Sequence, residues 1–418
     1  MFVDSLLKLS SKAVAKGLKE GFYKHHNVSL EPPLSDKVFD EVVMITADCS
    51  PVLAKETGLK LNLTNFYSNW FIVTHTDMKN LHSHDIRSVA LNLNEFSKVP
   101  EFIIETDEGE DQLDIFLVLK TCLNENSLQN LKHLDLYYSG DLPDDWVQLI
   151  GSLLPNLQSF KCQTVSKEEF ELICRSFPNL TRLEINYANS DTLNDTFNLK
   201  NLQVFEMIHS TFVSSENLEK LFEIPNLRVL DVSWSEGFFE NLLLCDGTFQ
   251  NLKFIECGGS NITQTQLRDL VARHPSLESI AILETPCDLV DFSDVGIKVM
   301  NLGTIESTMH TLHYSLYQHN GYRLSDQTRR CIDRIKTFLE DETIPEGFRE
   351  DEFLELMMKA YRSYDFNVID CLVLFIKHMF PGQPIDDVIQ NEQSKTPLFV
   401  KRRWAAQVVS TYNALFKL

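Results

Sequence analysis

Residues 177–185 read Phe-Pro-Asn-Leu-Thr-Arg-Leu-Glu-Ile, an apolar-x-Asn-Leu-x-x-apolar-x-apolar phrase that returns throughout the middle of the chain. Copies begin at Leu128, Leu154, Phe177, Leu199, Ile224, Phe249 and His274, with steps of 26, 23, 22, 25, 25 and 25 residues. Leucine-rich repeats have this spacing and a length of roughly 20–29 residues. The phrase therefore predicts a leucine-rich-repeat array.

Each copy predicts a short strand, because residues such as Leu131, Leu134 and Leu136 can bury one face of it. The remainder of a copy predicts a helix. Capping-box spacing, which begins helices, relates Ser166 to Glu169 and Thr263 to Gln266. One strand and one helix per repeat predict an α/β solenoid over residues 128–304, with the strands lining its concave side.

One position departs from the commonest repeat, in which an asparagine follows the third leucine by three residues. Other residues stand there, namely Ser139, Val165, Ala188, Ser210, Ser235, Ser260 and Thr285. Hydroxyl groups can bond the turn backbone in place of the amide at five of these seven positions.

The segments on either side of the repeats differ from them. Upstream, residues 51–127 predict degenerate repeats, because Leu59, Leu61 and Leu63 alternate, as do Val89, Leu91 and Leu93. Downstream, residues 305–418 lose the phrase and predict about five helices, near 309–319, 325–340, 350–363, 366–379 and 400–416. These helices would at least cap the open end of the array.

The N-terminal segment, residues 1–50, predicts two short amphipathic helices. The first covers residues 5–14, and the second follows Pro32-Pro33 with Ser35 as its N-cap. Two interpretations remain open. The pair of helices either caps the array or forms a docking hairpin for another protein.

Composition excludes several classes of function. The formal net charge of −22 is unfavourable for nucleic-acid binding, which requires clustered lysine and arginine. Nine cysteines without a CxxC pair indicate reduced thiols in the cytoplasm or nucleus. We find no signal peptide and no apolar run that could span a membrane, so no membrane association is expected.

Catalytic and metal-binding motifs give no support for an enzyme or a cofactor. No nucleophile elbow, zinc-protease or P-loop spacing occurs. The pair His82-x-His84 lacks nearby further ligands and is interpreted as two ordinary surface histidines. The sequence thus predicts a binding protein with no catalytic, metal or cofactor site.

Side chains between the buried ones should face the concave surface. The central column is Asp135, Lys161, Glu184, Glu206, Asp231, Glu256 and Ala281, and exposed candidates flanking it are Tyr137, Tyr187, Ile208 and Trp234. Five acidic residues in seven predict a groove for a protein substrate with a basic segment. Two alternatives stay open: such repeats favour aspartate in this column generically, and Trp234 packs in the turn.

The order of these segments resembles the Zyg-eleven/Zer-one family of substrate receptors for cullin-two RING ubiquitin ligases. That family has an elongin box, a cullin box, leucine-rich repeats and armadillo-like helices. The resemblance implies elongin-binding residues Ser5, Leu6, Leu9, Ser10 and Val14, with Ser10 in place of the family's cysteine. It implies cullin-binding residues Leu34, Ser35, Val38 and Val42, with Ser35 in place of a proline.

The resemblance implies an adaptor that binds elongin C with elongin B, cullin-two with its RING protein, and a substrate on Asp135, Tyr137, Glu184, Glu206, Asp231, Trp234 and Glu256. Residues 305–418 would be a truncated armadillo-like domain, so the glycine-degron pocket of the longer family array is not expected. The alternative is a leucine-rich-repeat scaffold or inhibitor with no ubiquitin ligase role.

Overall fold

The computed structural model describes residues 6–46, 48–68, 74–105, 111–163, 166–188, 193–317 and 321–341, with several helical residues between 352 and 375. Ser5 and the predicted helix at 400–416 lie outside these residues. The chain divides into two compact units. The N-terminal unit comprises Phe2–Ile255 and Arg273–Ser276, and the C-terminal unit comprises Glu256–Ala272 and Leu277–Leu418.

The N-terminal unit alternates strands and helices. Its first elements are α1 (Leu6–Lys19), β1 (Val28–Leu30), α2 (Leu34–Ile45), α3 (Ser50–Leu53), β2 (Leu59–Leu61), β3 (Asn65–Tyr67), α4 (His75–Leu81), β4 (Ser88–Asn92), β5 (Ile103–Glu105), β6 (Asp111–Leu113), α5 (Ile115–Cys122) and α6 (Glu125–Asn130). The phrase-bearing part follows with β7 (His133–Tyr137), α7 (Trp146–Leu153), β8 (Ser159–Cys162), α8 (Lys167–Ser176), β9 (Arg182–Asn186), β10 (Val204–Ile208), β11 (Val229–Asp231) and α9 (Phe238–Leu242).

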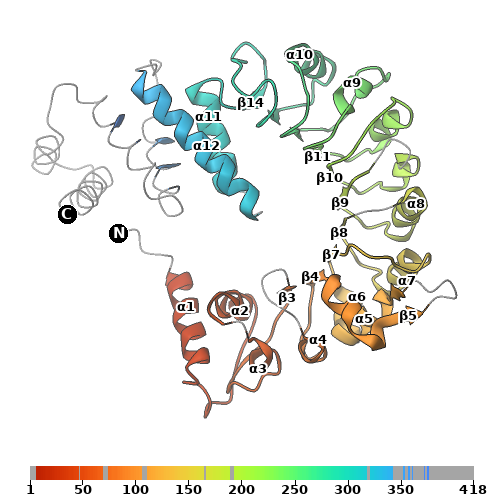
Figure 1. The fold of residues 1–418 in the computed structure, drawn as a ribbon, viewed down its shortest axis with the longest axis vertical. Coiled ribbons are helices and arrows are strands. Elements are labelled where there is room, and N and C mark those ends of the chain that lie inside the picture. The colour runs from red at the N-terminus through yellow and green to blue at the C-terminus, as the bar shows by residue number, and fades with distance from the viewer. Residues whose placement is uncertain are drawn as a thin grey trace, which may run out of the picture. The chain divides into compact units, whose positions relative to one another are not determined.

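A parallel sheet forms the centre of this unit, in the strand order β3-β4-β7-β8-β9-β10-β11. Figure 1 shows β7 to β10 side by side, with α7 and α8 on one side of them. The predicted strands of the phrase are confirmed. Equivalent phrase positions are register partners and fully buried, namely Leu134, Phe160, Leu183, Phe205 and Leu230.

The asparagine of the phrase has a structural role that the sequence alone did not indicate. In five copies its side-chain amide donates to a backbone carbonyl of the preceding copy, at 2.9 Å from Asn156 to Gln129 and 2.8 Å from Asn226 to Lys200. Asn179, Asn201 and Asn251 make the same bond. The repeated asparagine thus links neighbouring copies by a ladder of hydrogen bonds.

The prediction of one helix per copy is confirmed only in part, because the copies that begin at Phe177 and Leu199 have short 3-10 helices after their strands, Thr196–Asn198 and Leu218–Glu223. Two predicted helix starts are confirmed. Ser166 and Glu169 form a reciprocal capping box at the start of α8, whose buried face is Phe170, Ile173 and Cys174. Thr263 and Gln266 bond reciprocally in the same way before α10 (Gln264–Arg273). A reciprocal box at Thr74 and Asp77 begins α4 and was not predicted.

In three successive copies the turn after the strand places one residue in the left-handed region, with φ of 59° at Tyr187, 56° at His209 and 58° at Trp234. The predicted hydroxyl bonds are confirmed just after these residues. Ser210 Oγ accepts from the Ala188 N–H at 3.0 Å, and Ser235 Oγ accepts from the Ser210 N–H at 3.1 Å. These bonds continue the ladder between copies.

The hydroxyl prediction has mixed outcomes elsewhere. Thr285 Oγ1 accepts from the Cys287 N–H at 3.1 Å, as expected, whereas Ser139 Oγ bonds the Asn94 side chain at 2.9 Å instead. The Ser260 hydroxyl is buried and has no hydrogen-bond partner among the described residues. Val165 lies outside the described residues.

Upstream of the phrases, one predicted strand is confirmed in the large sheet and one is corrected. Residues 88–92 form β4 and join the sheet. Leu59–Leu61 is a strand, but it pairs with β1 in a separate two-stranded parallel sheet. The strand that joins the large sheet there is β3, because Asp36 on α2 holds the backbone N–H groups of Thr64 and Asn65 at 2.8 and 3.1 Å.

The C-terminal unit contains the last strands and the first downstream helices. Its elements are α10, β13 (Ser279–Ala281), β14 (Lys298–Met300), α11 (Ile305–Tyr317) and α12 (Gly321–Glu340), and β12 (Phe254–Glu256) crosses the boundary between units. The helices predicted near 309–319 and 325–340 are confirmed as α11 and α12.

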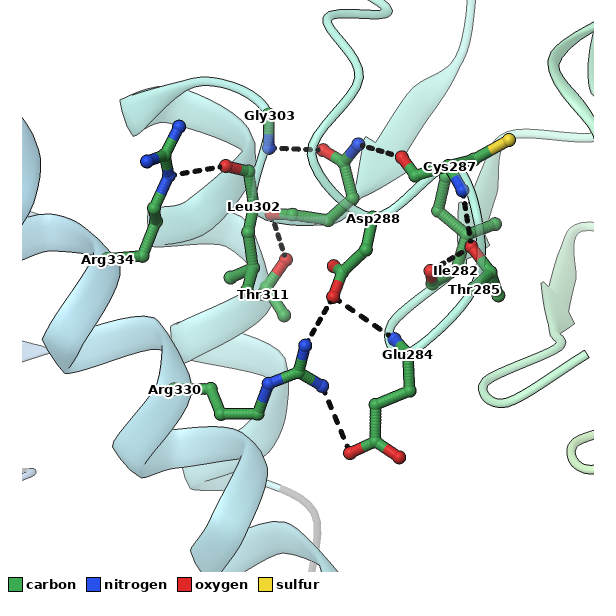
Figure 2. A network of polar contacts seen from close by, with 11 residues as sticks. Ile282, Glu284, Thr285, Cys287, Asp288, Leu302, Gly303, Thr311, Arg330 and Arg334 are labelled. Carbon is green, nitrogen blue, oxygen red and sulfur yellow. Dashed lines mark hydrogen bonds and ion pairs between the residues drawn. The ribbon is translucent and has the colours of Figure 1, made fainter.

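Polar contacts join α12 to the segment after β13 (Figure 2). Arg330 donates to the buried Asp288 at 2.6 Å and pairs with Glu284 at 3.1 Å, while Arg334 donates to the Leu302 carbonyl at 3.0 Å. Leu283 and Leu302 also share a hydrophobic core with Met309, Leu312, Ile332 and Ile335. Because of this shared core, the boundary of the compact units at Glu256 falls inside the predicted repeat region 128–304.

The structure is therefore a mixed α/β fold built around a parallel sheet. Among the described residues, we find no helix with both the length and the apolar character that crossing a membrane requires.

Candidate protein-binding surfaces

The helices α1 and α2 pack against each other at the start of the N-terminal unit (Figure 1). The buried row of α1 is Ser11, Ala15 and Leu18, spaced by four and three residues. On α2 the buried side chains are Ser35, Asp36, Val38, Phe39 and Val42. One face of each helix is thereby used inside the chain.

The predicted elongin-binding residues on α1 lie mostly away from this buried row. Leu9 is 40% exposed, Ser10 is exposed, and Val14 is half-buried. Leu7, which the motif did not select, is 39% exposed. Leu6 begins the helix, and Ser5 lies outside the described residues. Two large apolar side chains thus face solvent at the first turns of α1.

The predicted cullin-binding residues are divided between surface and core. Leu34 is 44% exposed, but Val38 and Val42 are only 3% and 2% exposed. Ser35 is fully buried and is not the N-cap of α2, which is Pro33. Its hydroxyl donates to the Asn62 carbonyl at 2.5 Å. Three of the four predicted side chains therefore belong to the packing of α2 and are inaccessible to a partner, which corrects the prediction for Ser35, Val38 and Val42.

A groove of about 590 Å³ lies along the α1–α2 pair. It is lined by Lys12, Ala15, Lys16, Lys19, Glu20, Glu41 and Ile45. Beside it, Met44 and Ile45 at the end of α2 are 72% and 37% exposed. Apolar surface is therefore exposed at both helices.

The predicted column of side chains is present in the N-terminal unit. Asp135, Lys161, Glu184, Glu206 and Asp231 are register partners on the five adjacent strands β7 to β11. Two of the carboxylates are paired, Glu184 with Lys161 and Glu206 with Arg182, each at 2.6 Å. The arginine lies two residues before Glu184 on β9 and was not recognised from the sequence.

Burial changes the charge of this column. It raises the pKa of Glu206 to about 8, with the neighbouring Glu184 adding to the rise and Arg182 opposing it. Burial likewise raises the pKa of Asp135 to about 6, against the opposing Lys161. The column is therefore less negative at neutral pH than its sequence indicates, because a buried carboxyl group disfavours its charged form.

A second row of side chains follows the column at the ends of the strands. Tyr187 and His209 stack with ring centroids 5.7 Å apart and planes at 18°, and His209 and Trp234 stack at 6.3 Å and 23°. Tyr187 is 59% and Trp234 is 39% exposed. We call these three residues the aromatic ladder. His209 was missed in the sequence, although its position in the phrase matches that of Tyr187 and Trp234.

Tyr137 and Glu256 complete the predicted concave residues. Tyr137 ends β7 and is 45% exposed. Glu256 belongs to the C-terminal unit, where the Tyr314 hydroxyl of α11 donates to its carboxylate. Its carboxylate is thus engaged within that unit.

His84 is structural, which corrects its surface interpretation, whereas His82 is exposed as predicted. The His84 side chain is 1% exposed, its Nδ1 accepts from the Leu63 N–H at 3.2 Å, and its Nε2 bonds the Leu53 carbonyl at 3.0 Å. Burial lowers the pKa of His84 to about 4. Within the part of the chain that the structure describes, no three His, Cys, Asp or Glu side chains lie close enough to hold a metal ion.

No family model matches the chain. The chain is similar to Gastrulation-defective protein 3 of Caenorhabditis elegans, with 25% identity over 345 residues. The match covers 80% of this chain and 47% of the relative, so the chain spans about half the length of the curated relative. A match of this length extends well beyond residues 128–304, so the similarity is not confined to the phrases.

Proposed function

We propose that the chain is a leucine-rich-repeat member of the Zyg-eleven/Zer-one family and acts as a substrate-binding adaptor of a cullin-two RING ubiquitin ligase. The observation that carries this proposal is Leu9, which is exposed on the side of α1 away from its buried row, while α2 packs against α1. The order of segments and the one strand per phrase, paired in a parallel register, support a solenoid with an armadillo-like end.

In this proposal elongin C, with elongin B, binds the first turns of α1. Leu9 would fill an apolar pocket of the partner, since an exposed leucine on an anchored helix is ordered before binding.

Cullin-two and its RING protein would contact the second helix of the pair, α2. Since Val38 and Val42 are buried, the accessible apolar groups on α2 are Leu34, Met44 and Ile45. No side chain of the chain would take part in the chemistry. The adaptor instead raises the effective concentration of the substrate near the ubiquitin-carrying enzyme, so we do not propose an enzyme.

The nine cysteines support a reducing compartment such as the cytoplasm or nucleus. All nine are buried thiols that form no disulfide. Burial raises the pKa of Cys49 to about 12, with Asp77 contributing, so its thiolate is disfavoured.

Co-purification of the full chain with elongin B, elongin C and cullin-two tests the proposal. We expect a stable complex with the wild type and its loss in a Leu7→Ser, Leu9→Ser variant. The matched control is Leu117→Ser on α5, which changes a leucine of similar exposure, 38%, and should leave the complex intact. Failure of the wild type to bind elongin would reject the adaptor and favour a scaffold or inhibitor.

A further inference from the structure

The aromatic ladder is an unusual surface on the N-terminal unit. Three rings from three successive turns stack with nearly parallel planes, at 18° and 23°. Tyr187 is 59% and Trp234 is 39% exposed, although side chains of this size bury much apolar area when they are placed in a core. Tyr187 and Trp234, the two end rings of the stack, therefore expose aromatic surface to solvent.

The backbone under the ladder is held in a conformation that these residues disfavour. Tyr187, His209 and Trp234 all have φ between 56° and 59°. Bulky L-residues rarely adopt this region, and such residues concentrate at functional sites. The same position in a later copy is Gly259, with φ of 73°, so the turn accepts glycine. Aromatic residues at three consecutive copies thus oppose the local backbone preference.

Charge near the ladder favours a cation. Each ring lies three residues after a carboxylate on the same copy, Glu184 before Tyr187, Glu206 before His209 and Asp231 before Trp234. With Asp135, the column has four carboxyl groups against the two cations Lys161 and Arg182, and because Glu206 is largely protonated at neutral pH a small net negative charge remains. A guanidinium group matches both features, because it stacks on aromatic faces and pairs with carboxylates.

We propose that the aromatic ladder binds arginine side chains of a basic segment in a partner protein, with the adjacent carboxylates supplying charge complementarity. The inference rests on the proposed function only in identifying that partner as the ligase substrate. It narrows the expected basic segment to one that contains arginine, because a planar guanidinium can stack on the rings, unlike the compact lysine ammonium.

Fluorescence anisotropy with the full chain tests the proposal, using a labelled short peptide of alternating arginine and serine as the probe. Peptides with lysine or neutral citrulline in place of arginine are the comparisons. We expect the arginine peptide to bind most tightly. A Tyr187→Gly, His209→Gly, Trp234→Gly variant should bind it about tenfold more weakly, the sum expected from losing the cation–π contacts of Tyr187 and Trp234.

Glycine is the informative replacement, because it is favoured at positive φ. The triple variant should therefore unfold at a temperature no lower than the wild type, which separates lost binding from lost folding. Trp234→Tyr is a second variant that keeps a ring and should retain binding. Phe22→Gly, which removes a 72% exposed ring from the turn after α1, is the matched control.

The proposal is overturned if the wild type binds none of the peptides at millimolar concentration, binds arginine and citrulline peptides equally, or loses nothing in the triple variant. The elongin co-purification gives an independent result. Arginine-peptide binding without an elongin complex would reject the adaptor and keep the ladder. An elongin complex without arginine-peptide binding would reject the proposed role of the ladder and keep the adaptor.

Discussion

The strands β7 to β11 and the α1–α2 pair make different use of their sequence patterns. On the strands, equivalent phrase positions have equivalent burial, as Leu183 and Phe205 show. On the helices, two residues that the sequence predicts to bind partners differ in burial, since Leu9 is exposed and Val38 is buried. A hydrogen-bonded register fixes which side chains face inward, whereas an amphipathic helix takes the rotation that its neighbour requires.

The largest expected effect comes from breaking the core of the strands. Phe205 is fully buried on β10 and stacks on Phe170 with centroids 6.2 Å apart. We expect Phe205→Ala to lower the free energy of unfolding by about 3–5 kcal/mol, because it removes buried area and leaves a cavity. Leu9→Ala should change it by less than about 0.5 kcal/mol. Equal shifts of the two urea-unfolding midpoints would contradict the comparison.

The next effect concerns charge in the column and depends on pH. The pKa of Glu206 is raised from 4.5 to about 8, so the folded state holds more protons than the unfolded state between these values. Stability from this group is therefore full below pH 4.5 and is lost as pH rises towards 8.

Glu206→Gln removes this dependence. Between pH 5 and pH 9, the free energy of unfolding of the variant should rise relative to that of the wild type by on the order of 2 kcal/mol. This value is discounted for the pairing of Glu206 with Arg182. Urea unfolding at the two pH values measures the gain. Parallel pH profiles for variant and wild type would show that Glu206 titrates at its ordinary pKa.

A smaller effect is expected inside the helix pair. Ser35→Ala removes the buried hydroxyl that bonds the Asn62 carbonyl and should cost about 1–2 kcal/mol. Leu34→Ser, the exposed neighbour, should be nearly neutral in stability. If Ser35→Ala leaves stability unchanged but Leu34→Ser lowers it, the described rotation of α2 is incorrect.

The smallest effect is expected in the asparagine ladder between copies. Asn201→Ala removes its hydrogen bond to the Pro178 carbonyl and should cost about 0.5–1 kcal/mol, since the bond is exposed. Asn130 is the matched control, because its amide bonds Asn126 within its own helix. A thermal-unfolding shift for Asn201→Ala no larger than for Asn130→Ala would remove the proposed linking role.

Local signals were sufficient where neighbouring residues make the decisive contacts. The capping box of Ser166 and Glu169 and the helices α11 and α12 could be predicted because their hydrogen bonds are short-range. Long-range pairing was not predictable. Leu59–Leu61 has the alternation of a strand, yet its partner is β1, since alternation does not specify which strand lies beside it.

The candidate surfaces show the same division. The column from Asp135 to Asp231 could be read from the phrase, because its register follows from the repeat. The pairing of Arg182 with Glu206, the raised pKa of that glutamate and the stacking of His209 between Tyr187 and Trp234 could not. Each depends on distances across strands that the sequence does not contain.

The sequence by itself determined the period, the strand in each copy and the apolar face of each helix, because backbone geometry converts residue spacing directly into side-chain direction. The tertiary structure alone decided that Val38, Val42 and Ser35 lie inside while Leu7 and Leu9 remain outside. It also decided how much charge the column keeps. Burial and ion pairing arise only when segments distant in the chain are brought into contact, and both the accessible surface and the ionisation of a carboxyl group depend on those contacts.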